Sequence, residues 1–397
     1  MRLGVLATHP IQYHAPLFRE LAERLDLHVY FAHRQSGAGQ AAAGFGVEFE
    51  WDVDLLDGYN HTFLTNRSTA PDTNTFGGCD TPDIRDIIRR EAFDAFLVTG
   101  WNTRSFWQAI TACWRSNTPL LIRGDSQLAT TRSRAKQLVK SVLYRAFIPR
   151  FDGYLVVGER ARAYYLHYGA DPGRMHFAPH FVDNEFFRAG AEAAQHGKPL
   201  RDELGYNADT IVLLFVGKFI PKKRPLDVVA AAGRLRRQGL DVRLLFVGSG
   251  ELEAVLRREV DAEDVPTDFA GFKNQTELPA YYAAADLLVL PSDAGETWGL
   301  VVNEAMACGT PAVVSSAVGC SPDLIDAGKT GKTFPLGDVH ALAKAVASLL
   351  PHLGTAAITS SVAAKMDTYS VHQAAEGTLR AVEAVTRSQP FPRALQV

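Results

Sequence analysis

The sequence predicts an α/β protein made of two doubly wound, Rossmann-like domains that face each other across a cleft. Short, continuously apolar runs alternate with longer segments of helical periodicity, and a polar stretch interrupts this alternation near residues 190–205. Continuous apolar strands separated by helices are typical of a parallel sheet covered on both faces. The length of 397 residues fits two or three domains of about 150 residues each.

The first half of the chain begins with an apolar strand that stops at His9-Pro10. Pro16 can open a helix, because apolar residues recur after it at helical spacing. The Gly- and Asp-rich region 34–82 predicts long loops. The further strands expected in this half are 27–32, 95–98, 120–122 and 154–157.

The second half restarts the alternation after a polar break at 189–209. Its expected strands are 211–216, 242–247, 287–290 and 312–314, and its expected helices are 226–238, 251–260, 278–285, 300–307, 339–350 and 371–387. The predicted domains are therefore 1–190 and 206–370, joined by a linker at 191–205. Residues 371–397 form a last helix and tail, with a return to the N-terminal domain as one alternative.

Composition narrows the class of protein. The 41 basic and 44 acidic side chains give a net charge of −3, which argues against a nucleic-acid partner bound by bulk charge. Four dispersed cysteines form no CxxC pair, which fits a reduced cytoplasm. No apolar run approaches 18 residues, and the apolar N-terminus is too short for a signal peptide, so no membrane-spanning helix is expected.

The segment that follows the predicted strand 287–290 opens a helix near Gly299. The amides of Gly299, Leu300 and Val301 are expected to be free there, and free amides at a helix start favour an anion.

Two carboxylates flank this predicted anion site, Glu296 before the helix and Glu304 inside it. Beside an anion, carboxylates are better suited to accept hydrogen bonds from the hydroxyls of a sugar or ribose. The alternative is that Glu296 only caps the helix and Glu304 is a solvated helix residue.

A basic loop follows the predicted strand 211–216. Gly217 ends the strand, and Lys218, Lys222, Lys223 and Arg224 come within the next seven positions. Basic groups at the carboxyl end of a strand suit a diphosphate, and the alternative is a solvated basic loop.

Two weaker signals remain. Gly248 belongs to a lone GxG after the strand 242–247, and no full GxGxxG follows, which disfavours a dehydrogenase. His9 and His14 border the carboxyl end of the first strand and are expected to face the cleft; alternatively, they are turn residues fixed by local hydrogen bonds.

The spacing from Glu296 to Glu304 matches the EX7E signature of the family-four retaining glycosyltransferases, which have the GT-B fold, and the chain resembles that family. Gly217-Lys218 with Lys223 resembles the family's Gly-Arg and downstream Lys. Asp125 stands in the region where the family often has a His near the donor sugar. Further resemblances are at 179–183, 269–272 and 318–323 with Gly331; Cys320 and Asp323 depart from the family's Gly and Glu.

The resemblance implies a retaining enzyme that moves a sugar from a nucleotide-sugar, by preference UDP-linked, to a saccharide, lipid-linked or small-molecule acceptor. The C-terminal domain would bind the donor and the N-terminal domain the acceptor. Lys218 and Lys223 would neutralise the leaving diphosphate, whose phosphate takes the acceptor proton. Glu296 would hold the donor sugar and Glu304 the ribose.

The other implied donor contacts are Gly217, Gly248, Phe272, Lys273, Gly299, Leu300 and Val301. The candidate acceptor or sugar contacts are His9, His14 and Asp125. No cofactor, metal ion or nucleic acid is expected. Two alternatives stay open: a nucleotide-sugar epimerase of GT-B shape, and an inactive protein that binds sugar nucleotides.

Residues 131–150 predict a basic amphipathic helix. Arg132, Lys136 and Lys140 recur every four residues beside an apolar face. Such a helix can bind an anionic membrane surface, which predicts a cytoplasmic protein at the inner face of the membrane. The alternative is that the apolar face belongs to the domain core. The apolar residues are Leu138, Val139, Val142, Leu143 and Phe147.

Overall fold

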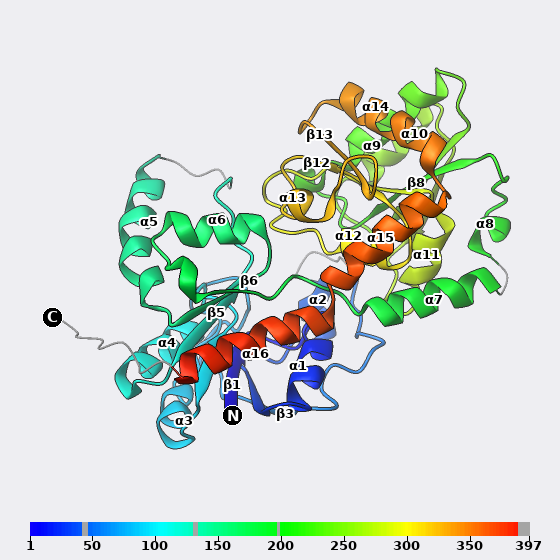
Figure 1. Ribbon diagram of the computed structural model, residues 1–397. Coiled ribbons are helices and arrows are strands. Elements are labelled where there is room, and N and C mark those ends of the chain that lie inside the picture. Colours follow the sequence, from blue (N-terminus) through cyan, green and yellow to red (C-terminus); the bar gives the residue numbers. More distant parts are fainter. Residues whose placement is uncertain (42–46, 130–133, 197–198, 388–397) are drawn as a thin grey trace. The chain divides into compact units, whose positions relative to one another are not determined.

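The computed structural model describes residues 1–41, 47–129, 134–196 and 199–387 (Figure 1). By its internal contacts the chain forms two compact units. Unit 1 consists of Met1–Gly39, Asp54–His180 and Val371–Val397, and unit 2 of Gln40–Val53 and Phe181–Ser370. Each unit contains one parallel sheet with interleaved helices, so the predicted class of two doubly wound α/β domains is confirmed.

Unit 1 contains a seven-stranded sheet in the order β3-β2-β1-β4-β5-β6-β7, and every pair of neighbours is parallel. The strands are β1 (Arg2–Ala7), β2 (Asp26–Phe31), β3 (Asn60–Phe63), β4 (Ala95–Val98), β5 (Leu120–Gly124), β6 (Gly153–Val156) and β7 (Met175–Phe177). The helices of this part of the chain are α1 (Ala15–Ala22), α2 (Gly37–Gln40), α3 (Ile84–Arg90), α4 (Arg104–Ser116), α5 (Arg134–Phe147), α6 (Glu159–His167) and α16 (Val371–Arg387).

The buried strands of unit 1 lie within two residues of their predicted positions, whereas β3 and β7 were not predicted. Both are edge strands whose residues are largely half-exposed or exposed. Edge strands therefore lack the continuous apolar run by which the inner strands are recognised.

Unit 2 contains a six-stranded parallel sheet in the order β10-β9-β8-β11-β12-β13. The strands are β8 (Ile211–Val216), β9 (Val242–Val247), β10 (Thr267–Gly271), β11 (Leu287–Leu290), β12 (Ala312–Ser315) and β13 (Gly331–Phe334). The helices are α7 (Asn184–His196), α8 (Leu200–Glu203), α9 (Pro225–Arg236), α10 (Glu253–Ala262), α11 (Leu278–Ala284), α12 (Val301–Ala307), α13 (Ser321–Leu324), α14 (Val339–Leu349) and α15 (Ala356–Thr368).

The domain boundary lies earlier than the sequence predicted. Residues 184–196 form the helix α7, which buries Phe187 and Ala191 and packs against α11 and α12. The boundary at 190 and a linker beginning at 191 are therefore wrong. The Ala- and Glu-containing stretch looks polar along the sequence, but these residues have high helix propensity, and their apolar members share one face.

The helix α16 belongs to unit 1, where it packs against α1, β6 and β7 (Figure 1). Its Gly377 lies so close to β7 that an added Cβ would approach the Phe177 carbonyl oxygen to 1.9 Å. The small side chain is thus what allows the helix to lie on the edge of the sheet.

Among the described residues, no single helix combines the length and the apolar composition needed to cross a membrane. One bent pair, Val339–His352 with Ala356–Arg387, meets those two criteria jointly.

Gly377→Ala is expected to lower the free energy of unfolding by about 1–3 kcal/mol. The added methyl group would press against backbone atoms of Phe177, which cannot move aside as a flexible side chain can. This loss exceeds the gain of about 1 kcal/mol that alanine brings to an unobstructed helix. Denaturant titration measures the change. The control is Gly77→Ala, at a glycine with no atom within 4 Å of an added Cβ; a Gly377→Ala protein as stable as the control would contradict the packing argument.

Candidate active site

The carboxyl ends of all six strands of unit 2 lie at one edge of its sheet, since every pair is parallel. The direction of winding reverses between β8 and β11, which are neighbours in the sheet. Ligands of doubly wound sheets bind beyond the strand ends at such a reversal. The loops after β8 and β11 contain the predicted basic loop and the predicted carboxylate Glu296, so the fold brings these two motifs to the expected position.

Glycines let the loops after β8 and β9 approach each other closely. Gly217 and Gly248 have positive φ values of +142° and +131°. An added Cβ on Gly248 would lie 2.1 Å from the Gly217 carbonyl oxygen. The amide of Gly217 donates to the Val247 carbonyl at 2.9 Å. The two predicted donor-contact glycines are therefore neighbours at the end of the sheet, where only glycine fits.

The loops after β8 and β11 are joined by an ion pair between Lys223 and Glu296. Only 13% of the Lys223 side chain and 14% of the Glu296 side chain are exposed. A backbone hydrogen bond of 2.9 Å, from the Asp293 amide to the Lys222 carbonyl, adds a second connection. A half-buried charge requires a partner, so each residue holds the other in place.

This pairing contradicts two of the alternatives considered for the sequence. Lys223 is not a residue of a solvated basic loop, and Glu296 does not cap α12, whose N-cap is Leu300 without a side-chain cap. Lys222 remains exposed.

Lys218 lies next to this pair and is half-buried. Burial lowers the pKa of its ammonium group, the charges of Lys222 and Lys223 lower it further, and the Glu296 carboxylate opposes the shift. The charges of Lys222, Lys223 and Glu296 all act on Lys218, so in this group three positive charges stand against one negative charge. Such a site is suited to an anion with more than one negative charge.

The helix α12 begins at Val301, two residues later than the predicted opening near Gly299. Gly299 has φ +97° and is buried, while Leu300 and Val301 are half-buried. The first turn is fixed from inside by a hydrogen bond of 2.8 Å from the Trp298 indole to the Asn303 side chain. The role of Gly299, Leu300 and Val301 as donor contacts stays a prediction.

Glu304 is only 1% exposed, so it is not a solvated helix residue. The buried hydroxyl of Tyr282 on α11 donates a hydrogen bond to its Oε2 atom. The sequence pattern indicates no role for Tyr282. Its pairing with Glu304 depends on how α11 packs against α12, and no local motif encodes that packing.

Phe272 and Lys273, the other predicted donor contacts, lie in the loop after β10. The Lys273 ammonium pairs with Glu277 at 3.0 Å. The Phe272 ring packs against Phe49, with centroids 4.4 Å apart, and Phe49 in turn contacts Trp51.

Phe49 and Trp51 belong to the segment 47–53, which the sequence analysis described only as loop. Two polar contacts hold this segment on unit 2: Asn274 donates to the Glu50 carbonyl at 2.7 Å, and the Thr276 amide donates to Asp52 at 3.1 Å. Residues from the first half of the chain therefore complete the surroundings of Phe272.

In unit 1, His9, His14 and Asp125 gather at the carboxyl edge of the sheet. Burial lowers the pKa of His9 to about 4 and that of His14 to about 3, with nearby positive or histidine side chains contributing. Both imidazoles are therefore neutral at physiological pH and can exchange hydrogen bonds with hydroxyl groups. The alternative of turn residues fixed by local hydrogen bonds stays open: the Thr8 hydroxyl lies 3.0 Å from Nδ1 of His9, and the His14 amide donates to the Ile11 carbonyl at 3.0 Å in the turn before α1.

Two residues without an assigned role in the sequence analysis join this cluster, Arg123 and His180. The buried Arg123 guanidinium donates to the carbonyls of Ala178 at 2.5 Å and Pro179 at 2.7 Å. His180 lies 3.9 Å from the Asp125 carboxylate, and burial together with Arg123 lowers its pKa well below the ordinary value. Both residues lie at or just after the carboxyl end of a strand, and this position could have identified them as candidate site residues.

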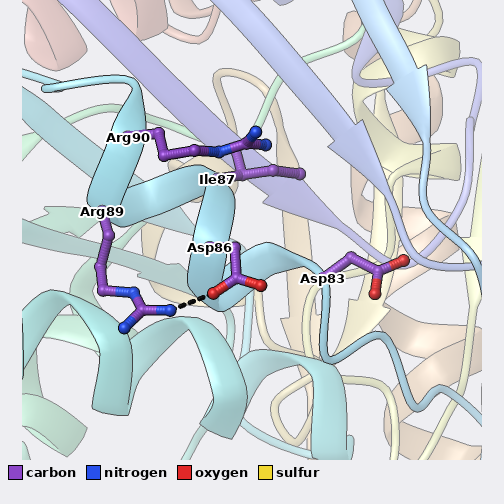
Figure 2. Close-up of a pocket in the computed structure, with 5 residues that line it drawn as sticks. All are labelled: Asp83, Asp86, Ile87, Arg89 and Arg90. Carbon is purple, nitrogen blue, oxygen red and sulfur yellow. Dashed lines mark hydrogen bonds and ion pairs between the residues drawn. The ribbon is translucent and has the colours of Figure 1, made fainter.

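A separate hollow of unit 1, of about 670 Å³, lies on α3 (Figure 2). Asp86 and Arg89, three residues apart on α3, form an ion pair beside it, so charges of both signs neutralise one another there. Its lining residues precede β4 in the chain, and none of them is a predicted site residue. It is lined by Asp83, Asp86, Ile87, Arg89 and Arg90.

The chain is similar to known proteins in sequence. The family described as "Glycosyl transferases group 1" matches residues 198–357. The D-inositol 3-phosphate glycosyltransferase 2 of Catenulispora acidiphila is 38% identical over 199 residues, which cover 47% of this chain and 45% of the relative. The match thus spans about half the length of that relative. A D-inositol 3-phosphate glycosyltransferase of Mycobacterium avium is 30% identical over 305 residues, covering 73% of this chain and 67% of the relative.

Two solved structures share the fold at low identity. Alr3699/HepE of Anabaena, crystallised with UDP, has a TM-score of 0.71 and 17% identity, and the alignment covers 97% of this chain and 100% of that one. A glycosyltransferase of Rickettsia africae has a TM-score of 0.73 and 13% identity, with 98% and 99% covered. Two Rossmann-like units of this kind define the GT-B fold. The chain belongs to the group 1 glycosyltransferases, within family four of the GT-B enzymes.

If Lys218 binds a polyanion as predicted, Lys218→Arg should retain binding of the probe UDP at alkaline pH, where the wild type should lose it. The lowered pKa means that Lys218 gives up its charge at a lower pH than an ordinary lysine, whereas arginine stays charged. Calorimetric titration from about pH 7 to about pH 10 compares the two proteins. Lys222→Arg, at an exposed lysine of the same loop, is the control; identical pH profiles for wild type and Lys218→Arg would show that Lys218 does not bind the anion.

Proposed function

We propose that the protein is a retaining glycosyltransferase that transfers a sugar from a UDP-linked donor to a hydroxyl group of a saccharide, lipid-linked or small-molecule acceptor. The observation that supports this most is the Lys223–Glu296 pair, with Lys218 beside it, at the winding reversal of the unit 2 sheet. Relatives named as D-inositol 3-phosphate glycosyltransferases and a structural neighbour solved with UDP-glucose support the substrate class.

In this proposal the lysines act on the leaving group. The bond between the sugar C1 and the donor phosphate oxygen breaks, and negative charge grows on the diphosphate as it leaves. Lys218 and Lys223 are partly shielded from water, so once the donor is bound they stabilise that charge more strongly than they would in water. The acceptor oxygen bonds to C1 on the face that the diphosphate leaves, and its proton passes to the departing phosphate. No general base of the protein is needed.

In this proposal Glu296 has two successive roles. Before the donor binds, it neutralises Lys223; when the diphosphate arrives, the lysine gains a new partner and the carboxylate can accept hydrogen bonds from the sugar hydroxyls. Glu304, a buried residue of α12, accepts the ribose hydroxyls. The lysines supply the positive charge that a metal ion supplies in other transferases, so we propose transfer without a metal or other cofactor.

Unit 1 binds the acceptor in this proposal. The neutral imidazoles of His9 and His14 and the Asp125 carboxylate are suited to the hydroxyls of a polyol or sugar. Arg123 uses two of its nitrogens on backbone carbonyls, which makes it a support for the strand ends.

We also propose that the protein acts in the cytoplasm and contacts the inner face of the membrane through α5. Val142 is 65% and Leu143 58% exposed, with the exposed Arg145 beside them. Phe147, expected on the same apolar face, is instead buried in the core, and Lys140 lies over the rings of Tyr144, Tyr164 and Tyr168. Arg132 and the side chains of Lys136, Leu138 and Val139 lie outside the part of the chain that the structure describes.

The two glutamates are expected to fail differently. Glu304→Gln should weaken binding of UDP and of UDP-sugar alike, by about 1.5–3 kcal/mol, the contribution of a hydrogen bond to a charged group. Glu296→Gln should leave UDP affinity close to wild type while lowering kcat, because it positions the sugar during bond cleavage. Calorimetry with UDP and a transfer assay, each repeated with EDTA, measure both effects. Equal loss of UDP affinity in the two variants would contradict the division of roles.

Leu143→Asp is expected to reduce co-sedimentation of the protein with anionic vesicles, because it removes an exposed apolar contact and adds a repelling charge. The loss should be largest at low salt, where the basic residues contribute most. Phe76→Ser provides the control, since Phe76 is also exposed in unit 1 but lies outside α5. No binding of the wild-type protein to these vesicles at low salt would refute the membrane contact.

A further inference from the structure

Tyr282 lies on α11, behind the glutamate of α12 that we assign to the ribose. Its side chain is fully buried, and its hydroxyl donates to the Glu304 Oε2 atom. The ring packs against Phe187 at a centroid distance of 6.2 Å, and the Tyr282 carbonyl accepts a hydrogen bond of 2.8 Å from the Thr310 hydroxyl. Both the ring and the backbone of Tyr282 are therefore fixed.

The backbone of Glu304 is fixed within α12. Its amide donates to the Leu300 carbonyl at 3.0 Å, and its carbonyl accepts from the Cys308 amide at 3.1 Å. The carboxylate is close enough to contribute, after burial, to the raised pKa of the Cys308 thiol. A buried carboxylate needs donors around it, and the Tyr282 hydroxyl is one that reaches it from the neighbouring helix.

A carboxylate offers about four acceptor positions on its two oxygens. A hydroxyl fixed on Oε2 occupies one of these positions and restrains rotation of the carboxylate plane. Two adjacent hydroxyls of a ribose match a carboxylate only when its plane has one defined orientation. The orientation that Tyr282 imposes therefore decides how well Glu304 accepts a vicinal diol.

We propose that Tyr282 is a positioning residue which orients Glu304 for the 2′ and 3′ hydroxyls of the donor ribose, and so sets the preference of the enzyme for ribonucleotides. The inference rests on the proposed role of Glu304 as the ribose acceptor. Tyr282 does not touch the nucleotide; it acts only through the carboxylate that it holds.

The test compares UDP with 2′,3′-dideoxy-UDP by calorimetry, because the two ligands differ only in the diol. Tyr282→Phe keeps the ring and removes the hydroxyl. It is expected to weaken UDP binding roughly tenfold, the effect of one hydrogen bond to a charged group, and to leave the dideoxy compound within about twofold of wild type. The ratio of the two affinities should therefore fall.

Tyr206→Phe is the matched control. Tyr206 is another buried tyrosine of unit 2 whose hydroxyl bonds a carboxylate, that of Asp268 at 2.7 Å, and the change should alter the affinity of neither ligand. Equal weakening of both ligands by Tyr282→Phe would mean that the tyrosine only supports the fold. No weakening of either would mean that Glu304 is oriented without it. Each of these results overturns the inference.

Glu304→Gln separates this inference from the proposed function. If it leaves the ratio of affinities unchanged, the ribose role of Glu304 is wrong, and the inference fails with it. If it lowers the ratio while Tyr282→Phe does not, only the positioning role fails. The double variant Tyr282→Phe/Glu304→Gln leaves no unpaired carboxylate behind, so it also serves if Tyr282→Phe does not fold. Its ratio is expected to equal that of Glu304→Gln; a further fall would show that Tyr282 acts on the ligand independently.

Discussion

Unit 2 buries most of an ion pair: only 13% of the Lys223 side chain and 14% of the Glu296 side chain are exposed. Neither charge is stable there without a partner, and the partner of each comes from the other loop. The pair therefore fixes the distance between the loops after β8 and β11 before any ligand arrives. Lys218, Gly217 and the chain leading into α12 all take their positions from these two loops.

Close backbone approach is the second condition of this site. Gly319 fits against the chain before α12 only because it has no side chain: an added Cβ would lie 1.7 Å from the Thr297 carbonyl oxygen. Its amide donates to the Glu296 carbonyl at 3.0 Å. The conformation of Glu296 thus depends on a glycine from the loop after β12. Buried polar bonds, tight backbone contacts and one ion pair act together, which explains why the site residues come from so many strand ends.

The sequence was sufficient for the inner strands, which continuous apolar runs encode locally. It also singled out Lys223 and Glu296, from a basic loop and from the spacing of one motif, and the structure pairs these two side chains; their roles, like those of Lys218 and Glu304, stay predictions. It was insufficient where partners are distant. Tyr282 and Phe49 carry no motif, and their importance follows only from what packs beside them. The edge strands β3, β7, β10 and β13 and the helix α7 were missed because short, half-exposed or alanine-rich segments resemble loops in composition.

The distribution of the chain between the units has a consequence for how the protein is made. Residues 47–53 leave the ribosome long before Phe272, Asn274 and Thr276, against which they pack in unit 2. Unit 1 in turn needs α16, which is synthesised after the whole of unit 2. Domains usually fold one after another during translation. Here each unit contains segments that are synthesised far apart in time. The nascent chain therefore carries an incomplete unit 1, whose strands β6 and β7 are not yet covered by α16, until the whole of unit 2 has been translated.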